Sequence, residues 1–200
     1  MYKMEVVEYR FLTTNDKYDL NYPWWSRAYE YPFVLEQLQK LGASTSSKIH
    51  NTSWGFEGMH VRFKEVLDNE YSDCIHSDVR ASILPKTMYY DITKTIESRY
   101  KNFFDFVINI STIEEVGHDN ISIIKNLFDQ VKVGGYLILT FDYDKNVKTE
   151  ACGSINIDSV NEFTGMKIEK NKYMISGNNS AYIQHYYNNL NCGVLILKKV

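Results

Sequence analysis

The segment SWGFEG, residues 53–58, is the first place in the chain where residue types and spacing suggest binding chemistry. It lies at the end of a weak predicted strand, residues 49–53, and precedes a helical pattern, and it matches GxGxxG with Ser53 in the first glycine position. Gly55 and Gly58 let the backbone turn tightly and let a ligand approach the main chain. The hexapeptide alone fits an ordinary strand-to-helix loop equally well.

Two aspartates follow where a nucleoside would need them. Asp78 ends the apolar run 73–77, about twenty residues beyond the loop, where a carboxylate can accept hydrogen bonds from both ribose hydroxyls. Asp91 ends the run 88–90, in a position for the adenine amino group or another donor. Each aspartate by itself can also be a helix cap or a surface acid. Together with the loop, in this order, they predict a nucleoside-containing cofactor.

Acid and base side chains follow the apolar run 104–110, at the end of a predicted strand, where ligands bind in open parallel sheets. They are Ser111, Glu114, Glu115, His118 and Asp119. His118 is the preferred general base, because a histidine with an unperturbed pKa near 6.5 removes protons at neutral pH, and Glu114 or Asp119 would orient it. Alternatively, the glutamates begin an exposed helix and His118 caps a turn. No HxxxH spacing and no CxxC pair occurs, so we predict no metal site.

The elements that must position these residues follow an alternating order from residue 48 onward. Short apolar runs alternate with helical patterns, which predicts a mostly parallel sheet with helices on both faces. We expect strands at 49–53, 73–77, 88–90, 104–110 and 136–141, and a closing antiparallel hairpin from 166–176 and 193–198. We expect helices at 32–41, 59–67, 92–100, 121–131 and 158–163, the fourth closed by Gly134 and Gly135 and the fifth capped by Asp158.

The chain is predicted to form one domain. Residues 1–47 form an N-terminal segment, aromatic and irregular up to residue 31, followed by a helix with Pro32 in its first turn and Gly42 at its end. Residues 48–200 form the α/β core. The cluster Trp24, Trp25, Arg27, Tyr29 and Glu30 is interpreted either as a lid over the cofactor, with Arg27 paired to a carboxylate, or as a cover for the first helix.

Composition excludes several classes of function. The 200 residues carry 22 Lys+Arg against 25 Asp+Glu, a net charge of -3, so there is no basic field for general nucleic-acid binding. No apolar run approaches the roughly 20 residues needed to cross a bilayer, and acidic residues interrupt the N-terminus where a signal peptide would be apolar. We therefore expect a cytoplasmic protein without membrane attachment.

At this point the chain resembles the class I S-adenosylmethionine-dependent methyltransferases, from about residue 24 to its end. The segments most similar to that family are FDFVINISTIEEVGH (104–118) and LFDQVKVGGYLILTFDYD (127–144); further carriers are residues 26–38, 48–60, 72–78 and 89–93. The resemblance implies an α/β Rossmann-like sheet, mostly parallel with a C-terminal antiparallel hairpin and helices on both faces. It also implies S-adenosylmethionine as cofactor.

The resemblance assigns the cofactor contacts to ten positions: Arg27, Asn51, Ser53, Trp54, Gly55, Gly58, Asp78, Asp91, Ile92 and Ser111. Two of them depart from the family, because Asn51 stands where an acidic residue is usual and Ser53 replaces the first glycine. The departures fit either a weaker affinity or a loop adapted to the same ligand through hydrogen bonds from Asn51 and Ser53.

The implied activity is transfer of a methyl group to oxygen on a small polar acceptor, such as a sugar or a sugar nucleotide. Alignment of the reactants would provide most of the acceleration, and a general base would assist a hydroxyl acceptor. Two alternatives remain open: a catalytically silent methyltransferase-like module that binds or regulates a partner, and a nucleic-acid or protein methyltransferase with locally concentrated Lys and Arg.

Overall fold

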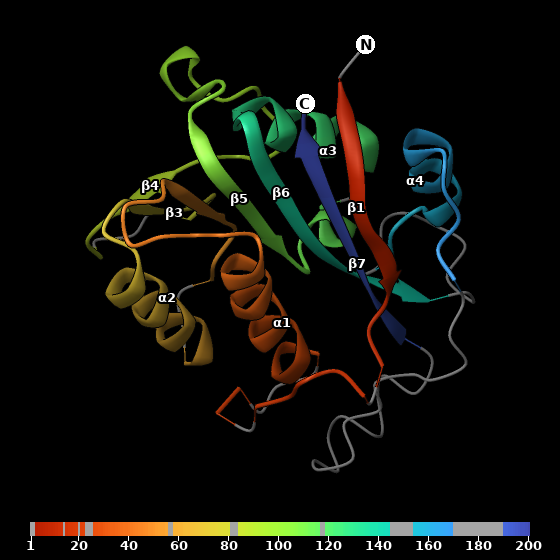
Figure 1. Cartoon of the computed structure of the whole chain (residues 1–200), viewed down its shortest axis with the longest axis horizontal. Coiled ribbons are helices and arrows are strands. Elements are labelled where there is room, and N and C mark those ends of the chain that lie inside the picture. Colours follow the sequence, from red (N-terminus) through yellow and green to blue (C-terminus); the bar gives the residue numbers. More distant parts are fainter. Residues whose placement is uncertain are drawn as a thin grey trace.

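A seven-stranded sheet with the order β1-β7-β6-β5-β2-β3-β4 runs through the protein (Figure 1). This computed structural model describes residues 3–13, 15–19, 21–22, 26–55, 58–80, 84–116, 119–144, 154–169 and 190–200. The strands are β1 (Met4–Phe11), β2 (Ile49–Thr52), β3 (Cys74–Asp78), β4 (Thr87–Tyr89), β5 (Phe104–Ile110), β6 (Val131–Asp144) and β7 (Leu190–Lys199).

The pairing of these strands confirms the predicted fold class. Strands β2 to β6 pair in parallel, and β7 is antiparallel to both β6 and β1. The chain moves outward from β2 through β3 to β4, then returns to the other side of β2 to begin β5. Strand order therefore reverses between β2 and β5, and in open α/β sheets ligands bind beyond the carboxyl ends of the strands at such a point.

The outermost strand beside β7 comes from the N-terminus, so the prediction that residues 1–31 are irregular was wrong. In β1, half-buried and exposed side chains alternate until Tyr9 and Phe11 enter the core. The predicted hairpin partner of β7, residues 166–176, is described only to residue 169 and contributes a single bridge between Glu169 and Arg10. Within the described residues, β7 pairs with β6 and β1 instead.

Helices cover both faces of the sheet (Figure 1). They are α1 (Arg27–Lys40), α2 (Met59–Glu70), α3 (Asn120–Gln130) and α4 (Ile157–Thr164), with 3-10 turns at Ser98–Tyr100 and Ile113–Glu115. Two apolar clusters explain the layering: α1 and α2 pack with Ile108 and Ile138, whereas α3 and α4 pack with Val107 and Leu137. Successive strand residues point to opposite faces, so apolar strands such as β5 supply both clusters.

Several helix boundaries differ from the prediction for local reasons. The helix expected at 92–100 is absent except for its 3-10 turn: residues 92–93 form a turn, 95–97 are irregular, and Ile92 and Ile96 enter the core from this segment. Pro32 lies inside α1 and not in its first turn; the carbonyl of Ala28, which Pro32 cannot satisfy, accepts from the Asp19 N–H at 2.8 Å.

The ends of the later helices also differ from the prediction. Gly134 and Gly135 lie within β6 and do not close α3, since the helix ends at Gln130. The cap of α4 is Asn156, whose side chain accepts from the Ser159 N–H, and not Asp158.

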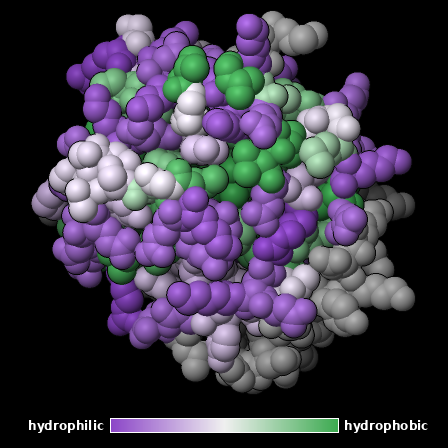
Figure 2. Space-filling view, viewed as in Figure 1, coloured by the Kyte–Doolittle hydropathy of each residue, from purple (hydrophilic) through white to green (hydrophobic). Residues whose placement is uncertain are grey.

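The face seen in Figure 2 is mostly polar, with apolar side chains confined to smaller areas. None of the helices that the structure describes is both long enough and apolar enough to cross a membrane.

Candidate functional site

A pocket of about 370 Å³ lies beyond the carboxyl ends of the central strands, where the strand order reverses. Its volume is in the range of small-molecule sites. Nine of the ten residues predicted to contact the cofactor line it: Arg27, Asn51, Ser53, Trp54, Gly55, Asp78, Asp91, Ile92 and Ser111. The tenth, Gly58, is the N-cap of α2 and is not a lining residue.

The loop after β2 keeps the backbone of a glycine turn despite its serine. Ser53 has φ 55°, in the left-handed region that glycine adopts freely, and its N–H donates to the Ser77 carbonyl at 2.6 Å. Holding a non-glycine residue there costs about 1–2 kcal/mol. A residue with a side chain does not fit at Gly55, because a Cβ at that position would lie 2.9 Å from Cδ2 of His60. The serine therefore preserves the loop path expected for a glycine.

Asp78 joins this loop to the end of β3. One carboxylate oxygen accepts from the Gly55 N–H at 3.4 Å, and the other accepts from the backbone N–H of Arg80 at 3.0 Å. The residue is 7% exposed and lines the pocket. Since each carboxylate oxygen has two lone pairs, Asp78 retains the capacity to accept from a bound hydroxyl.

The segment after β4 supplies an acid and an apolar surface. The Asp91 carboxylate accepts from the N–H and hydroxyl of Thr93, at 2.9 and 2.7 Å, which fixes its orientation. Ile92 lines the pocket, as does Val79, whose side chain is unusually exposed for a large apolar residue at 54%. Two apolar side chains beside two carboxylates suit a flat, polar-edged ring system.

Asn51 is hydrogen-bonded to a histidine on the neighbouring strand β3. Its Nδ2 lies 3.1 Å from Nδ1 of His76, and Nε2 of that ring lies 3.2 Å from the Asp68 carboxylate. Burial lowers the pKa of His76 to about 4, so the imidazole is neutral at physiological pH.

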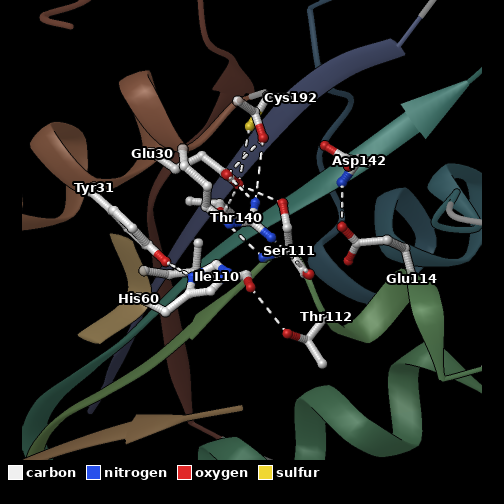
Figure 3. Close-up of polar contacts among 12 residues, drawn as sticks. Glu30, Tyr31, His60, Ile110, Ser111, Thr112, Glu114, Thr140, Asp142 and Cys192 are labelled. Atoms are coloured by element: carbon white, nitrogen blue, oxygen red, sulfur yellow. Dashed lines mark hydrogen bonds and ion pairs between the residues drawn. The ribbon is translucent and has the colours of Figure 1, made fainter. Parts of the chain in front are cut away.

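The site also contains residues that sequence reasoning missed. Tyr31 on α1 is hydrogen-bonded through its hydroxyl to Nδ1 of His60 (Figure 3). The Tyr31 ring stacks on Phe63 with centroids 4.0 Å apart. Burial, with a smaller contribution from Arg27, lowers the pKa of His60 to about 4. One signal was available: Tyr31 follows Arg27 by four residues, so both lie on one helix face. The other lining residues that were missed are Phe63, Val79, Arg80, Ile110, Thr112 and Val116.

Arg27 forms an ion pair with Glu30 on the same helix; its predicted pairing with a carboxylate as part of a lid over the cofactor stays a prediction. Glu30 is fully buried and accepts hydrogen bonds from Ser26, Ser111 and Thr140, and from the Cys192 thiol at 3.4 Å (Figure 3). Burial raises the pKa of Glu30, but the charge of Arg27 and the hydroxyl donors outweigh it, so the pKa is lowered overall. This carboxylate thereby ties α1 to β5, β6 and β7.

The structure describes three members of the N-terminal cluster that was interpreted as a lid or as a cover for the first helix. Trp24 and Trp25 lie outside the described residues. Tyr29 stacks on Tyr18 with centroids 5.6 Å apart, and Glu30 points into the protein. Of the cluster's described members, Arg27 reaches the pocket.

The predicted acid and base residues after β5 are dispersed. His118 lies outside the described residues, so its role as general base stays a prediction. Asp119 differs from its predicted role, because it caps α3 by accepting from the N–H of Ile121 and the hydroxyl of Ser122. Ser111, at φ 38°, and Glu115 line the pocket.

Glu114 also differs from its predicted role, since it is fully buried and turned toward β6. Its Oε1 accepts from the Asp142 N–H at 2.8 Å, and its Oε2 has no hydrogen-bond partner among the described residues (Figure 3). Burial and the charge of Asp142 raise the pKa of Glu114 well above its usual range. A carboxyl group in that environment is held in the neutral acid form.

Two groups of side chains in the described part of the chain have the ligand types and spacing of a metal site. They are Asp68, Cys74 and His76, and Glu30, Asp142 and Cys192, with ligand atoms within 4.8 Å of one another. In each group an acid is already paired with cations: Asp68 with Lys64 and Lys86, and Glu30 with Arg27. The positive charges of these side chains would repel a metal ion, so we do not propose a metal site at either group.

Comparison with known proteins identifies the fold. No protein-family model and no curated protein sequence matches the chain. Solved structures do match. Phosphoethanolamine N-methyltransferase 2 of Haemonchus contortus, in complex with S-adenosylmethionine, is 13% identical with a TM-score of 0.55 over 82% of this chain and 51% of that one. The chain thus spans about half the length of that enzyme.

Two further structures match over most of both chains. The [4+2]-cyclase SpnF is 10% identical, with a TM-score of 0.61 over 96% of this chain and 87% of that one. A putative sarcosine dimethylglycine methyltransferase from Galdieria sulphuraria is 11% identical, with a TM-score of 0.55 over 84% of each chain. At these identities the matches show the fold alone. The protein has the Rossmann-like fold of the class I S-adenosylmethionine-dependent methyltransferases, as the sequence resemblance implied.

The Glu30 network gives a first expectation. Glu30→Gln leaves Arg27 without its buried counter-ion, so we expect the free energy of unfolding at pH 7 to fall by about 3 kcal/mol or more. Because the pKa of Glu30 is lowered from 4.5 in the folded state, its contribution is present above that pH and is lost as the pH falls below it. Urea unfolding at pH 7 and pH 4 measures both effects.

The matched control for Glu30→Gln is Glu36→Gln on the same helix. Glu36 is 42% exposed and pairs with Lys40 at 3.3 Å, so its loss changes stability by about 0.5 kcal/mol or less. Equal effects of the two substitutions would contradict the structural importance of Glu30.

Glu114 gives a second expectation, in which the stability that the group contributes falls as the pH rises, the opposite of Glu30. Its pKa is raised above the ordinary 4.5, so from that pH upward the folded state holds a proton that the unfolded chain has released. Stability due to this group is lost as the pH rises, by up to about 1.4 kcal/mol per pH unit. Glu114→Gln removes this loss, so the variant gains stability over wild type at pH 8 relative to pH 5. Thermal unfolding at both pH values tests this, with the adjacent exposed Glu115→Gln as control; parallel pH profiles for wild type and Glu114→Gln would contradict it.

Proposed function

We propose that the chain binds S-adenosylmethionine in this pocket and transfers its methyl group to oxygen on a small polar acceptor. The observation that carries the proposal is the convergence of nine residues, drawn from five separate segments of the sequence, on one pocket at the reversal of strand order.

The side chains match the chemical groups of such a cofactor. Asp78 and Asp91 are acceptors for ribose hydroxyls and an amino group, and Val79 and Ile92 offer apolar surface for an adenine ring. Arg27 is a cation for a carboxylate, since a guanidinium has five N–H donors and its ion pair with Glu30 does not use all of them. The cofactor, when bound, supplies an activated methyl group on a sulfonium.

The protein's own contribution is alignment and exclusion of water. The α1 side chains Arg27 and Tyr31 and the α2 residue His60 form one wall, and Thr112 and Glu115 line the side that follows β5. Oriented reactants can gain about 7–11 kcal/mol from proximity. We assign the general base to His118 and the acceptor to the sugar or sugar-nucleotide class, in the cytoplasm. The polar side chains after β5 support a hydroxyl-bearing acceptor.

A second candidate is a catalytically silent module of the same fold. One observation favours it: Asn51 and Ser53 depart from the methyltransferase pattern. In addition, the structurally similar SpnF is described as a [4+2]-cyclase, so the fold alone does not imply methyl transfer. Cofactor binding and turnover therefore need separate measurements.

Cofactor binding is tested by calorimetry with S-adenosylmethionine and S-adenosylhomocysteine. We expect micromolar binding that Asp78→Ala weakens about 10–100-fold, because hydrogen bonds to a charged group contribute about 1.5–3 kcal/mol. The control is Asp73→Ala, an exposed aspartate just before β3, at the end opposite Asp78; it should bind like wild type. Absence of heat with either ligand would contradict the proposed function.

Turnover is tested with a panel of sugars and sugar nucleotides, followed by release of S-adenosylhomocysteine. His118→Ala should lower kcat by about 10²–10⁴-fold, the usual contribution of a general base, and leave the cofactor Kd unchanged. Unchanged kcat would remove His118 as the base. Turnover on amines but not on hydroxyl compounds would contradict the acceptor class.

A further inference from the structure

Asn51 and His76 are direct neighbours in the parallel register of β2 and β3. Asn51 is 2% exposed and His76 is fully buried, yet Asn51 also lines the pocket. The side chain of Asn51 thus lies between a buried imidazole and the space for a ligand. The Nδ2 atom of Asn51 is hydrogen-bonded to Nδ1 of His76 at 3.1 Å.

The identity of the donor in each contact follows from Asp68. This carboxylate is paired with the Lys64 and Lys86 ammonium groups, and hydrogen bonding to Lys64 helps to lower its pKa despite partial burial. An ionised carboxylate only accepts hydrogen bonds. The contact of 3.2 Å between Asp68 and Nε2 of His76 therefore requires the proton on Nε2.

A neutral imidazole carries one N–H, so Nδ1 of His76 must be the acceptor. The charged groups around the ring are Asp68 and Lys64 on α2 and Lys86 before β4, and His50 on β2 is itself neutral at physiological pH because burial lowers its pKa to about 4. An Nδ1 acceptor can pair only with the NH₂ of Asn51. The amide oxygen of Asn51 is then the atom left for the pocket.

We propose that Asp68 and His76 are positioning residues that fix the orientation of the Asn51 amide, so that a neutral hydrogen-bond acceptor faces an N–H or O–H donor of the bound ligand. The proposal rests on the proposed function in one respect: the ligand toward which the Asn51 amide is oriented is the cofactor. It explains why the chain has Asn51 at a position where the similar family usually has an acid. A carboxylate there would face the lone pair of Nδ1, whereas an amide donates to it.

The proton arrangement is tested without any ligand. In ¹⁵N-labelled protein at pH 7, the ring nitrogens of His76 should report a neutral imidazole protonated at Nε2. Asn51→Asp places a second carboxylate beside Nδ1 and should raise the pKa of His76 by about 1–3 pH units. An Nδ1–H tautomer in the wild-type protein, or an unchanged pKa of His76 in Asn51→Asp, would overturn the proposal.

The positioning role is tested by two substitutions of the histidine. His76→Asn retains an oxygen acceptor near the place of Nδ1, and His76→Leu removes it. We expect His76→Leu to weaken S-adenosylmethionine binding about 3–10-fold, the contribution of one hydrogen bond, and His76→Asn to restore it to within about twofold. Cys74→Ala, two residues away on the same face of β3, is the packing control and should bind like wild type.

Equal losses in His76→Asn and His76→Leu would overturn the positioning role and indicate a purely structural one. If wild-type protein binds neither S-adenosylmethionine nor S-adenosylhomocysteine, the proposed function fails, while the tautomer and the pKa in Asn51→Asp still decide the arrangement of Asp68, His76 and Asn51.

Discussion

The buried carboxylate of Glu30 is the contact on which the geometry of the pocket depends. It lies where α1 crosses the sheet, and its partners come from α1, the end of β5, β6 and β7. Removing a carboxylate from water is costly unless a counter-charge and hydrogen bonds replace the lost hydration. Arg27 and the surrounding hydroxyls provide both, so α1 is held in one position, and Arg27 and Tyr31 form a pocket wall.

Two serines at strand ends complete the same region. Ser53 after β2 and Ser111 after β5 both have positive φ values, 55° and 38°. Non-glycine residues in such conformations cost about 1–3 kcal/mol each and persist where surrounding contacts determine the backbone. Here the Ser53 N–H is held by the Ser77 carbonyl, and the Ser111 hydroxyl donates to Glu30. The strain coincides with the pocket, as is common for ligand-binding sites.

The accuracy of the sequence prediction varied with how locally each feature is determined. Strand 104–110 was predicted with its observed bounds, because nearly every position is apolar and a doubly covered strand needs that pattern. Strand β1 was missed, because its charged residues resemble a surface segment until β7 pairs with it. Most of the residues predicted to contact the cofactor line one pocket because they lie at or just after the ends of β2, β3, β4 and β5; Arg27 lies on α1 and was assigned from the family resemblance. The contacts of Glu30 with Ser111, Thr140 and Cys192 and the contact of Tyr31 with His60 join residues distant in sequence. The helical spacing of Arg27 and Tyr31 shows only that they share a helix face, not which residues they contact.

The charges around the pocket bear on which ligand it holds. Arg27 is neutralised by Glu30, Arg80 contacts Asp78, and His60 is neutral at physiological pH. The other acids of the lining, Asp91 and Glu115, leave the site negative. In the function that we propose, a negative pocket would favour a sulfonium cation over its uncharged thioether product and so assist both cofactor capture and product release. An acid at position 51 would add a buried carboxylate without a counter-ion; the amide of Asn51 supplies a hydrogen-bond acceptor without that penalty.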